Sequence, residues 1–194
     1  MKNGKIKFWI VTVLILLTAF ADGLLTYIGT PDLAREGNPL VAYFGFGWAA
    51  LFIANFVIIS LVIIGARYAF VKYKSPLIPY EKYTEYSSML FFNRPDKFIW
   101  TLIGIPKNWK PVFAIAGYAL SICLIAGRII VVSEWLIYLT NAPFEAAYNN
   151  FRGLFPYERF DVVFVAVLAL ILCVYRMYRE FKTNKELITK ECDL

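Results

Sequence analysis

The stretch FWIVTVLILLTAFADGLLTYI, residues 8–28, decides the fold of this chain. A bilayer core about 30 Å thick needs a helix of about 20 predominantly apolar residues, and this stretch meets that requirement. Three more long apolar stretches follow, and the last reaches spanning length only with help from Phe160 and Met177. The sequence therefore predicts an all-α, four-span transmembrane helical bundle that forms a single membrane domain over residues 1–194. The predicted spans cover residues 8–28, 39–66, 112–140 and 160–177.

The composition supports the same fold class. Hydrophobic residues make up 60% of the chain and aromatic residues 18%, and the mean hydropathy is +0.60. A soluble domain is about half apolar and lacks apolar runs of this length. A transmembrane barrel would instead need segments of about ten residues with alternating hydrophobicity, and the sequence contains none.

The basic residues predict the orientation of the bundle. Lys and Arg are frequent before the first span, in residues 67–110 and in the C-terminal tail, whereas the two other connections carry only Arg35, Arg152 and Arg159. Because cytoplasmic loops carry the excess of Lys and Arg, both termini are expected in the cytoplasm and the protein in the cell (plasma) membrane. The net charge of +6 lies beside the spans, so membrane lipids are expected partners and nucleic acid is not.

The chain has no histidine and three cysteines. Haem or zinc held by histidine and catalysis by Ser–His or Cys–His pairs are therefore not expected. Cys123 and Cys173 fall inside predicted spans and Cys192 in the predicted cytoplasmic tail, so disulfides are not expected either. The composition still admits a divalent cation bound by oxygen ligands.

The connections between the spans have different characters. Residues 67–111 are rich in aromatic, basic and proline residues, which is typical of helical segments that lie in the cytoplasmic interface. Short segments of this kind are predicted at residues 89–92 and 98–105, and a docking surface for a cytoplasmic partner is the alternative. The outer connection, residues 141–160, has the size and aromatic content of a lid, with a short helix predicted over residues 144–151.

Several residues are predicted to serve the packing of the bundle. Pro39 suits the first position of the second span, because its missing N–H would be unpaired there in any case. Small residues four apart allow close approach of helices, and an asparagine in a span is expected to hydrogen-bond to a neighbouring helix. Asn55 is expected in the inner half of the bilayer, away from the outer ends of spans 1 and 2. The residues with these predicted structural roles are Pro39, Gly45, Ala49, Asn55, Gly117 and Ser121.

A carboxylate lies inside the first span. At Asp22 the charge costs about 3 kcal/mol or more, so a partner or a function is expected for it. Thr18 and Thr26 lie four residues to either side, on the same helix face. Arg128 is the basic residue of the third span, and both charges lie about 23 Å from the cytoplasmic ends of their helices. Opposite charges at matched depth are expected to pair, either as a structural ion pair or as part of a binding site.

The binding-site alternative draws on further polar residues expected at the same outer end of the bundle. Arg128 and Glu134 lie about 120° apart around their helix, so the two side chains are not expected to point at one spot. The additional candidate ligand-binding residues are Glu36, Asn38, Glu134, Arg159 and Asp161.

One pattern resembles a known family. The residues Asp22-x3-Thr26, followed by Glu36-x-Asn38-Pro39 at the start of the next span, resemble the signature of a family of small uncharacterised prokaryotic multi-spanning membrane proteins. The resemblance covers a short part of the chain around these residues. It implies no activity and no cofactor, and it marks the five named positions as the ones that matter.

Three functions are compatible with these features. Carboxylate oxygens suit a hard cation, with Asp22 and Glu36 as candidate ligands, and Arg128 suits a phosphate or carboxylate. The leading hypothesis is a non-catalytic, outward-facing site that binds or translocates an ion, an anionic small molecule or a lipid, within a homo-oligomer or with a partner membrane subunit. The second is a metal-assisted enzyme acting on a lipid phosphate, with Asp22 or Glu36 as general base. The third is an accessory or scaffold subunit of a membrane complex.

Overall fold

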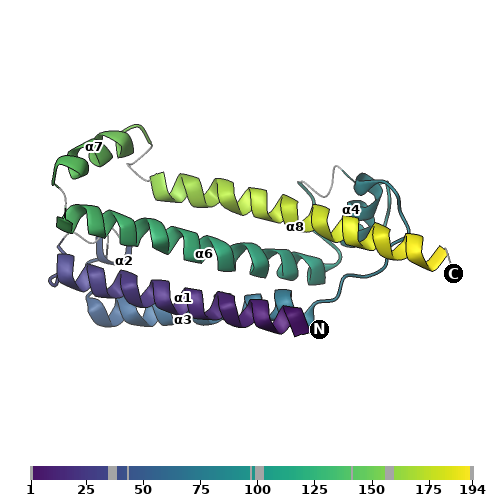
Figure 1. Cartoon of the computed structure of the whole chain (residues 1–194), viewed down its shortest axis with the longest axis horizontal. Coiled ribbons are helices and arrows are strands. Elements are labelled where there is room, and N and C mark those ends of the chain that lie inside the picture. Colours follow the sequence, from purple (N-terminus) through teal and green to yellow (C-terminus); the bar gives the residue numbers. More distant parts are fainter. Residues whose placement is uncertain are drawn as a thin grey trace. The chain divides into compact units, whose positions relative to one another are not determined.

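The computed structural model describes residues 2–34, 39–42, 44–96, 98, 103–140, 142–155 and 160–192. The regular elements in these ranges are all helices (Figure 1), so the all-α prediction is confirmed for the described part of the chain. The helices are α1 (Lys2–Gly29), α2 (Pro39–Ala42), α3 (Trp48–Arg67), the π-helical turn η1 (Tyr68–Lys72), α4 (Tyr83–Phe92), α6 (Trp109–Thr140), α7 (Ala142–Arg152) and α8 (Phe160–Cys192).

Four helical stretches in the described part are long and apolar enough to cross a membrane: Asn3–Gly29, Trp48–Lys72, Trp109–Thr140 and Phe160–Thr189. They match the four predicted spans in order, and they are compatible with a multi-pass membrane protein. The cytoplasmic location of the termini and the interfacial location of residues 67–111 stay predictions.

The second long helix begins later than predicted. Pro39 is the first residue of a helix, but that helix is α2, which ends at Ala42. Gly45 has a φ of +64°, a left-handed conformation that glycine adopts without the steric cost other residues meet. The long helix α3 then begins at Trp48. The prediction of one helix over residues 39–66 is therefore wrong at its start, because a glycine turn separates two helices there.

The fourth long helix extends further than predicted. The apolar part of the sequence ends near residue 177, whereas α8 continues to Cys192. The added residues are rich in Lys, Glu and Arg, which are strong helix formers that need no apolar surroundings. The length of the apolar run therefore indicates where a membrane span could end, but the helix itself continues beyond that point.

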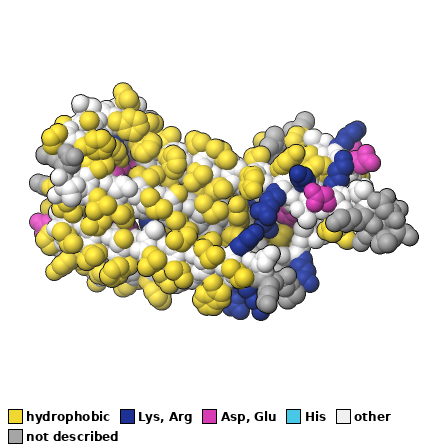
Figure 2. All heavy atoms as spheres, in the orientation of Figure 1, with side chains coloured by type: hydrophobic (Ala, Val, Ile, Leu, Met, Phe, Trp, Pro, Cys, Tyr) yellow, Lys and Arg dark blue, Asp and Glu magenta, His cyan; other side chains and the backbone are white. Residues whose placement is uncertain are grey.

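By its internal contacts the chain divides into two compact units. Unit 1 comprises Met1–Phe8, Ile64–Leu120 and Ala169–Leu194, and unit 2 comprises Trp9–Ile63 and Ser121–Leu168. In Figure 2, hydrophobic side chains cover most of the visible face of unit 2, whereas Lys and Arg side chains gather over unit 1. The apolar surface of unit 2 is compatible with the membrane-spanning character of the four long helices.

The core of unit 1 lies between α4 and the C-terminal part of α8. Tyr86 and Leu90 of α4 are fully buried and pack with Met177 and Phe181 of α8. The predicted short segment at residues 89–92 is thus the end of a longer helix that begins at Tyr83. Aromatic and aliphatic side chains at helical spacing drive this packing, because burying them removes apolar area from water.

A close helix approach also holds unit 1 together. A methyl group built on Gly117 of α6 would overlap the backbone of Gly65 in α3, so position 117 requires glycine. A methyl group built on Gly65 would lie 3.2 Å from Gly117 Cα, which is a tight contact. Gly117 thus lies at a close contact between two helices. The parallel prediction for Gly45 and Ala49 is wrong: Gly45 lies outside α3, both residues are exposed, and nothing lies within 4 Å of the Cβ position of Gly45.

In unit 2, α1, α3, α6 and α8 pack along one another. Gly29 of α1 lies against the ring of Trp135 in α6, and Cys123 Sγ of α6 contacts Val165 O of α8 at 3.8 Å. Ser121 of α6 is fully buried, as its predicted packing role requires. The four-helix packing brings side chains that are far apart in the sequence into one interior.

Two connections of unit 2 are also described. Trp48 Nε1 donates to Pro31 O at 2.8 Å, which fastens the start of α3 to the turn after α1. The connection between α6 and α8 contains α7, so the helix predicted over residues 144–151 is confirmed, with slightly wider bounds. The ring of Phe151 in α7 packs edge-on against Phe155 and Phe160, which fixes the end of α7 to the start of α8.

Candidate functional site

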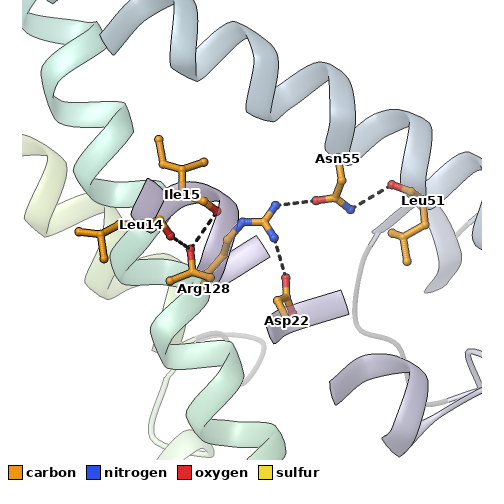
Figure 3. Close-up of polar contacts among 7 residues, drawn as sticks. Leu14, Ile15, Asp22, Leu51, Asn55 and Arg128 are labelled. Atoms are coloured by element: carbon orange, nitrogen blue, oxygen red, sulfur yellow. Dashed lines mark hydrogen bonds and ion pairs between the residues drawn. The ribbon is translucent and has the colours of Figure 1, made fainter. Parts of the chain in front are cut away.

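Three helices of unit 2 bring Asp22, Asn55 and Arg128 together (Figure 3). Arg128 Nη1 donates to Asp22 Oδ2 at 3.1 Å, and Arg128 Nη2 donates to Asn55 Oδ1 at 2.7 Å. Asn55 Nδ2 donates in turn to the backbone oxygen of Leu51, one turn earlier in α3, at 3.0 Å. The predicted ion pair is present, and so is the interhelical hydrogen bond predicted for Asn55.

The location predicted for Asn55 is wrong. Asp22 lies about two turns before the end of α1 at Gly29, and Asn55 lies about two turns after the start of α3 at Trp48. Because the two helices are antiparallel and joined by a short connection, both side chains reach the same depth. The prediction began the second span at Pro39, so it placed Asn55 too far along the helix and in the opposite half of the bilayer. Asn55 is therefore a member of the site.

Arg128 has more donors than the surrounding protein uses. The residue is only 7% exposed, and a guanidinium carries five N–H groups. Two hydrogen bonds go to Asp22 and Asn55, while Nε is buried and has no hydrogen-bond partner among the described residues. A buried donor left without an acceptor costs about 1–3 kcal/mol, so an acceptor oxygen brought to this guanidinium would stabilise the site.

A cavity of about 280 Å³ lies beside the ion pair, between α1 and α3. Its polar lining comes from Asp22, Thr26, Asn55 and Arg128, and among the described residues Asp22 is the one carboxylate in that lining. The rest of the wall is apolar, from Ala19, Phe20, Gly23, Trp48, Leu51, Phe52, Phe56 and Ile59. This cavity, called the Arg128 cavity below, combines an apolar wall with a few convergent polar groups, which is the usual character of a ligand site.

The rim of the Arg128 cavity is aromatic and open to the outside of the unit. Phe20 is 71% exposed, Phe52 61% and Phe56 72%. All three belong to the long apolar helices, so their exposed rings face the medium that surrounds those helices. The cavity is thus accessible from the apolar surface of unit 2.

Thr18 and Thr26 of α1 have different surroundings. Thr26 is almost fully buried and lines the Arg128 cavity, as expected for a site residue. The hydroxyl of Thr18 instead donates to Leu14 O at 2.8 Å and Ile15 O at 3.2 Å. A threonine in a span satisfies its hydroxyl in this way when no partner on another helix is available. Thr18 therefore does not extend the polar lining.

Glu134 and Asp161 belong to a different environment. Glu134 of α6 accepts a hydrogen bond from the hydroxyl of Tyr148 in α7, and neither carboxylate lines the Arg128 cavity. Burial, the hydrogen bond to Glu134 and, more weakly, the nearby charge of Asp161 hold the pKa of Tyr148 well above its ordinary value. The hydrogen bond between Tyr148 and Glu134 joins α7 to α6. The separation of Glu134 from the Arg128 cavity agrees with the 120° angle predicted between Arg128 and Glu134.

Three predicted site residues lie outside the described part of the chain: Glu36, Asn38 and Arg159. Within that part, no group of three or more His, Cys, Asp or Glu side chains is close enough to hold a metal ion. The divalent cation predicted at Asp22 and Glu36 therefore stays a prediction. At Asp22 it would compete with the guanidinium of Arg128, which already occupies one carboxylate oxygen.

Sequence reasoning missed the aromatic wall of the Arg128 cavity. Trp48 and Phe52 lie one turn apart in α3 with ring centroids 5.6 Å apart, and Tyr27 of α1 lies 5.8 Å from Trp48. The i, i+4 spacing of Trp48, Phe52 and Phe56 was visible in the sequence. In a helix that is apolar all round, however, such spacing does not single out one face.

The described residues thus define a helical protein with four long apolar helices and a polar cavity built around one buried ion pair. Comparison with known protein families, with curated proteins and with solved structures finds no match for this chain. The resemblance seen around Asp22 and Glu36 stays a prediction, and function has to be argued from the site itself.

Proposed function

We propose that this chain is a multi-pass membrane protein that binds the oxygen-rich headgroup of an anionic lipid in the Arg128 cavity. The observation that carries the proposal is the surplus of donors on Arg128, whose Nε is buried without a hydrogen-bond partner in the described part of the chain. Phosphate and carboxylate oxygens are the acceptors that a guanidinium binds best, because two parallel N–H groups reach two oxygens.

The size and rim of the cavity favour a lipid over a soluble ligand. A volume of about 280 Å³ is at the small end for ligand sites, so it suits a headgroup and not an entire lipid. The exposed rings of Phe20, Phe52 and Phe56 at the rim would contact acyl chains. A ligand with a polar head in the cavity and apolar tails along α1 and α3 uses both features.

The charge balance favours an anion over a cation. Asp22 and Arg128 cancel formally, and Asn55 adds no charge, so the cavity does not attract a free cation strongly. A cation would have to displace the guanidinium from Asp22, whereas an anion can bind the remaining N–H groups without breaking the ion pair. Binding is the core of the proposal; translocation, and assembly with a second copy or a partner subunit, extend it.

Two substitutions with opposite expected effects test the proposal. Arg128→Met removes the donors, so retention of phosphatidate should fall about tenfold or more, since hydrogen bonds to charged groups contribute that much. Asp22→Asn leaves the guanidinium uncompensated, so phosphatidate retention should be unchanged or stronger. Retention is measured for both variants by native mass spectrometry of the protein in mild detergent, with equal concentrations of phosphatidate and diacylglycerol. These two lipids differ only in the phosphate.

A steric variant separates loss of binding from loss of folding. Gly23 lines the Arg128 cavity, and nothing lies within 4 Å of its Cβ position, so Gly23→Leu should fill the cavity without distorting α1. Phosphatidate should then be lost while thermal stability is kept. A site whose ligand is held through a cation predicts the opposite result for the two charge variants: phosphatidate retention would be lost in Asp22→Asn and kept in Arg128→Met. That result would overturn the proposal.

The second hypothesis, a metal-assisted enzyme acting on a lipid phosphate, needs a carboxylate cluster or an activated nucleophile. In the described residues the cavity offers one carboxylate, already paired with Arg128, and the hydroxyl of Thr26. An activated nucleophile needs a neighbouring base, and the one carboxylate that could act as that base, Asp22, is paired with Arg128. The site as described favours binding over catalysis.

A further inference from the structure

A second polar pocket lies in unit 1, between the extended segment after η1 and the C-terminal part of α8. It has a volume of about 220 Å³, and Tyr73, Arg176, Arg179 and Glu180 supply its main polar groups. Leu77, which is 54% exposed, forms part of its apolar wall. All of these residues belong to unit 1. This pocket, called the Arg176 pocket below, is independent of the Arg128 cavity.

The carboxylate of Glu180 is the central group of the Arg176 pocket. Glu180 is only 8% exposed, and its Oε1 accepts a hydrogen bond from the hydroxyl of Tyr73 at 2.8 Å. Its Oε2 is buried without a hydrogen-bond partner in the described part of the chain. A buried carboxylate oxygen without a donor is costly, so the pocket contains an acceptor that a donor group of a ligand can satisfy.

Arg176 has a donor that is likewise without a hydrogen-bond partner among the described residues. Its Nε lies 4.0 Å from Glu180 Oε2, which is too far for a hydrogen bond, and is itself buried without a hydrogen-bond partner among the described residues. The guanidinium lies over the ring of Tyr118, with Cζ 5.5 Å from the ring centroid, which fixes its plane. One acceptor and one donor of the same pocket lining are therefore each left without a hydrogen bond among the described residues.

The charges of the pocket specify the sign of the ligand. Arg176 and the exposed Arg179 carry two positive charges, and Glu180 carries one negative charge, so the lining has a formal excess of one positive charge. A ligand that satisfies all three groups needs an anionic part for the arginines and a hydrogen-bond donor for Glu180 Oε2. A phosphodiester whose alcohol carries an ammonium or hydroxyl group has both parts in one small headgroup.

The position of the pocket along α8 favours a lipid as the source of that phosphodiester. Arg176 is the first charged residue after the apolar run of residues 162–175. The point where charges follow a long apolar run is where headgroups and water begin, and basic residues there attract lipid phosphates.

We propose that the Arg176 pocket binds a phosphodiester headgroup that carries a hydrogen-bond donor, as in phosphatidylethanolamine or phosphatidylglycerol. The phosphate oxygens accept from Arg176 and Arg179, and the ammonium or hydroxyl donates to Glu180 Oε2. Phosphatidylcholine has the same phosphate but no donor, so it satisfies the arginines and leaves Oε2 without a hydrogen bond. The pocket therefore distinguishes headgroups by their donor.

Retention of defined lipids tests this selectivity. The full-length protein in mild detergent is incubated with phosphatidylethanolamine, phosphatidylglycerol or phosphatidylcholine of identical acyl chains and measured by native mass spectrometry. The two donor-bearing lipids should be retained about tenfold better than phosphatidylcholine. Arg179→Gln should weaken retention of all three lipids. Glu180→Gln should abolish the preference while keeping phosphate binding, because it removes the acceptor charge and leaves both arginines.

Two controls make the outcome decisive. Lys185→Gln removes the same charge from α8 at an exposed position that does not line the pocket, and it should leave retention and preference as in the wild type. Arg128→Met should also leave the preference intact, which separates this site from the one proposed above. Equal losses in Arg179→Gln and Lys185→Gln, or no preference in the wild type, would overturn the proposal. Displacement by soluble glycerophosphoethanolamine at comparable concentration would support the same chemistry with a free phosphodiester as the source.

Discussion

Among the described residues, an arginine–carboxylate pair lines the pocket of each unit, and these two pairs are built differently. In unit 2, Arg128 and Asp22 are 106 residues apart in the chain and their charged atoms are 3.1 Å apart. In unit 1, Arg176 and Glu180 are neighbours on one face of α8, with 4.0 Å between the nearest nitrogen and oxygen. A pair between helices fixes how those helices pack, whereas a pair within one helix cannot. The first pair is therefore a structural contact as well as part of a proposed site, whereas the second does not join separate helices.

The elements of unit 1 are also joined by uncharged contacts. Ile78 N donates to Asn184 Oδ1 at 3.1 Å, and Asn184 Nδ2 donates to Ile78 O at 2.7 Å, so one side chain pairs both backbone groups of a buried residue. Gly65 and Gly117 bring α3 and α6 into backbone contact. We therefore expect unit 2 to be sensitive to changes in charge and unit 1 to changes in shape and in backbone hydrogen bonding.

The largest effect is expected when the pair in unit 2 is broken. Asp22→Ala leaves the charge of Arg128 buried and uncompensated, which should lower the free energy of unfolding by about 3–5 kcal/mol. Replacing both residues, as Asp22→Leu with Arg128→Met, should recover most of that loss because no buried charge is left. Unfolding of each variant in mixed detergent micelles measures the cost. Equal stability of Asp22→Ala and the wild type would show that the pair does not hold the helices.

The next largest effect is expected at the glycine contact of unit 1. Gly117→Ala forces α6 away from the backbone of Gly65, and overpacking of this kind costs about 1–3 kcal/mol. Gly23→Ala is the matched control, because its added methyl group meets nothing within 4 Å. Since alanine is the better helix former, the control should be neutral or stabilising by up to about 1 kcal/mol. The same unfolding measurement compares them, and equal effects of the two substitutions would contradict the contact.

A smaller and more local effect is expected at Asn184. Asn184→Ala removes both hydrogen bonds to Ile78, which should cost about 1–2 kcal/mol and loosen the segment before α4. Hydrogen–deuterium exchange should show the amide of Ile78 exchanging about tenfold faster, with α6 unchanged. Thr189→Ala, at an exposed position of the same helix, is the control. Uniform faster exchange throughout the protein would contradict a local role.

The features that sequence predicted well depend on local patterns. Four long apolar helices follow from apolar length alone, and α7 follows from a short helical pattern between two breaks. The pairing of Asp22 with Arg128 followed because an ionised residue inside a span needs a partner at the same depth. Depth could be counted along uninterrupted helices, and α1 and α6 are uninterrupted.

The features that sequence missed depend on where backbone and side chains meet in three dimensions. Gly45, with its φ of +64°, lies between α2 and α3, so α3 begins at Trp48 and not at Pro39. Asn55 therefore lies nearer the start of its helix than predicted. The partner of Glu134 was missed because nothing in the sequence showed α7 folding back toward α6. Glu180 and Asn184 looked like ordinary members of a charged helix end, although both are buried by the segment that contains Tyr73 and Ile78.

A further prediction concerns the third member of the unit 2 site. Asn55→Leu removes the acceptor for Arg128 Nη2 but leaves the ion pair with Asp22, so it should cost only about 1 kcal/mol. Comparison of this cost with that of Asp22→Ala shows how much of the stabilisation by the site comes from the ion pair. Unfolding in mixed micelles measures it, with Leu51→Ile as a volume-conserving control in the same cavity wall. A cost as large as that of Asp22→Ala would mean that Asn55, and not the carboxylate, is the main partner of Arg128.

The smallest effect is expected from the pH dependence of unit 1. Burial and then the neighbouring carboxylate of Glu180 raise the pKa of Tyr73 well above its ordinary value near 10. Because the folded state holds the phenolic proton more tightly, Tyr73 stabilises the fold below about pH 10 and loses that contribution as the pH rises toward its folded pKa. Between about pH 10 and 11.5 the wild type should therefore lose more stability than Tyr73→Phe, which has no proton to release. Glu180→Gln should reduce the difference, since it removes part of the cause. Parallel stability curves for the wild type and Tyr73→Phe over this range would show that neither burial nor the hydrogen bond to Glu180 holds the phenolic proton. Glu180 Oε1 would then be as available to a ligand as Oε2, and the Arg176 pocket would present two acceptors and not one.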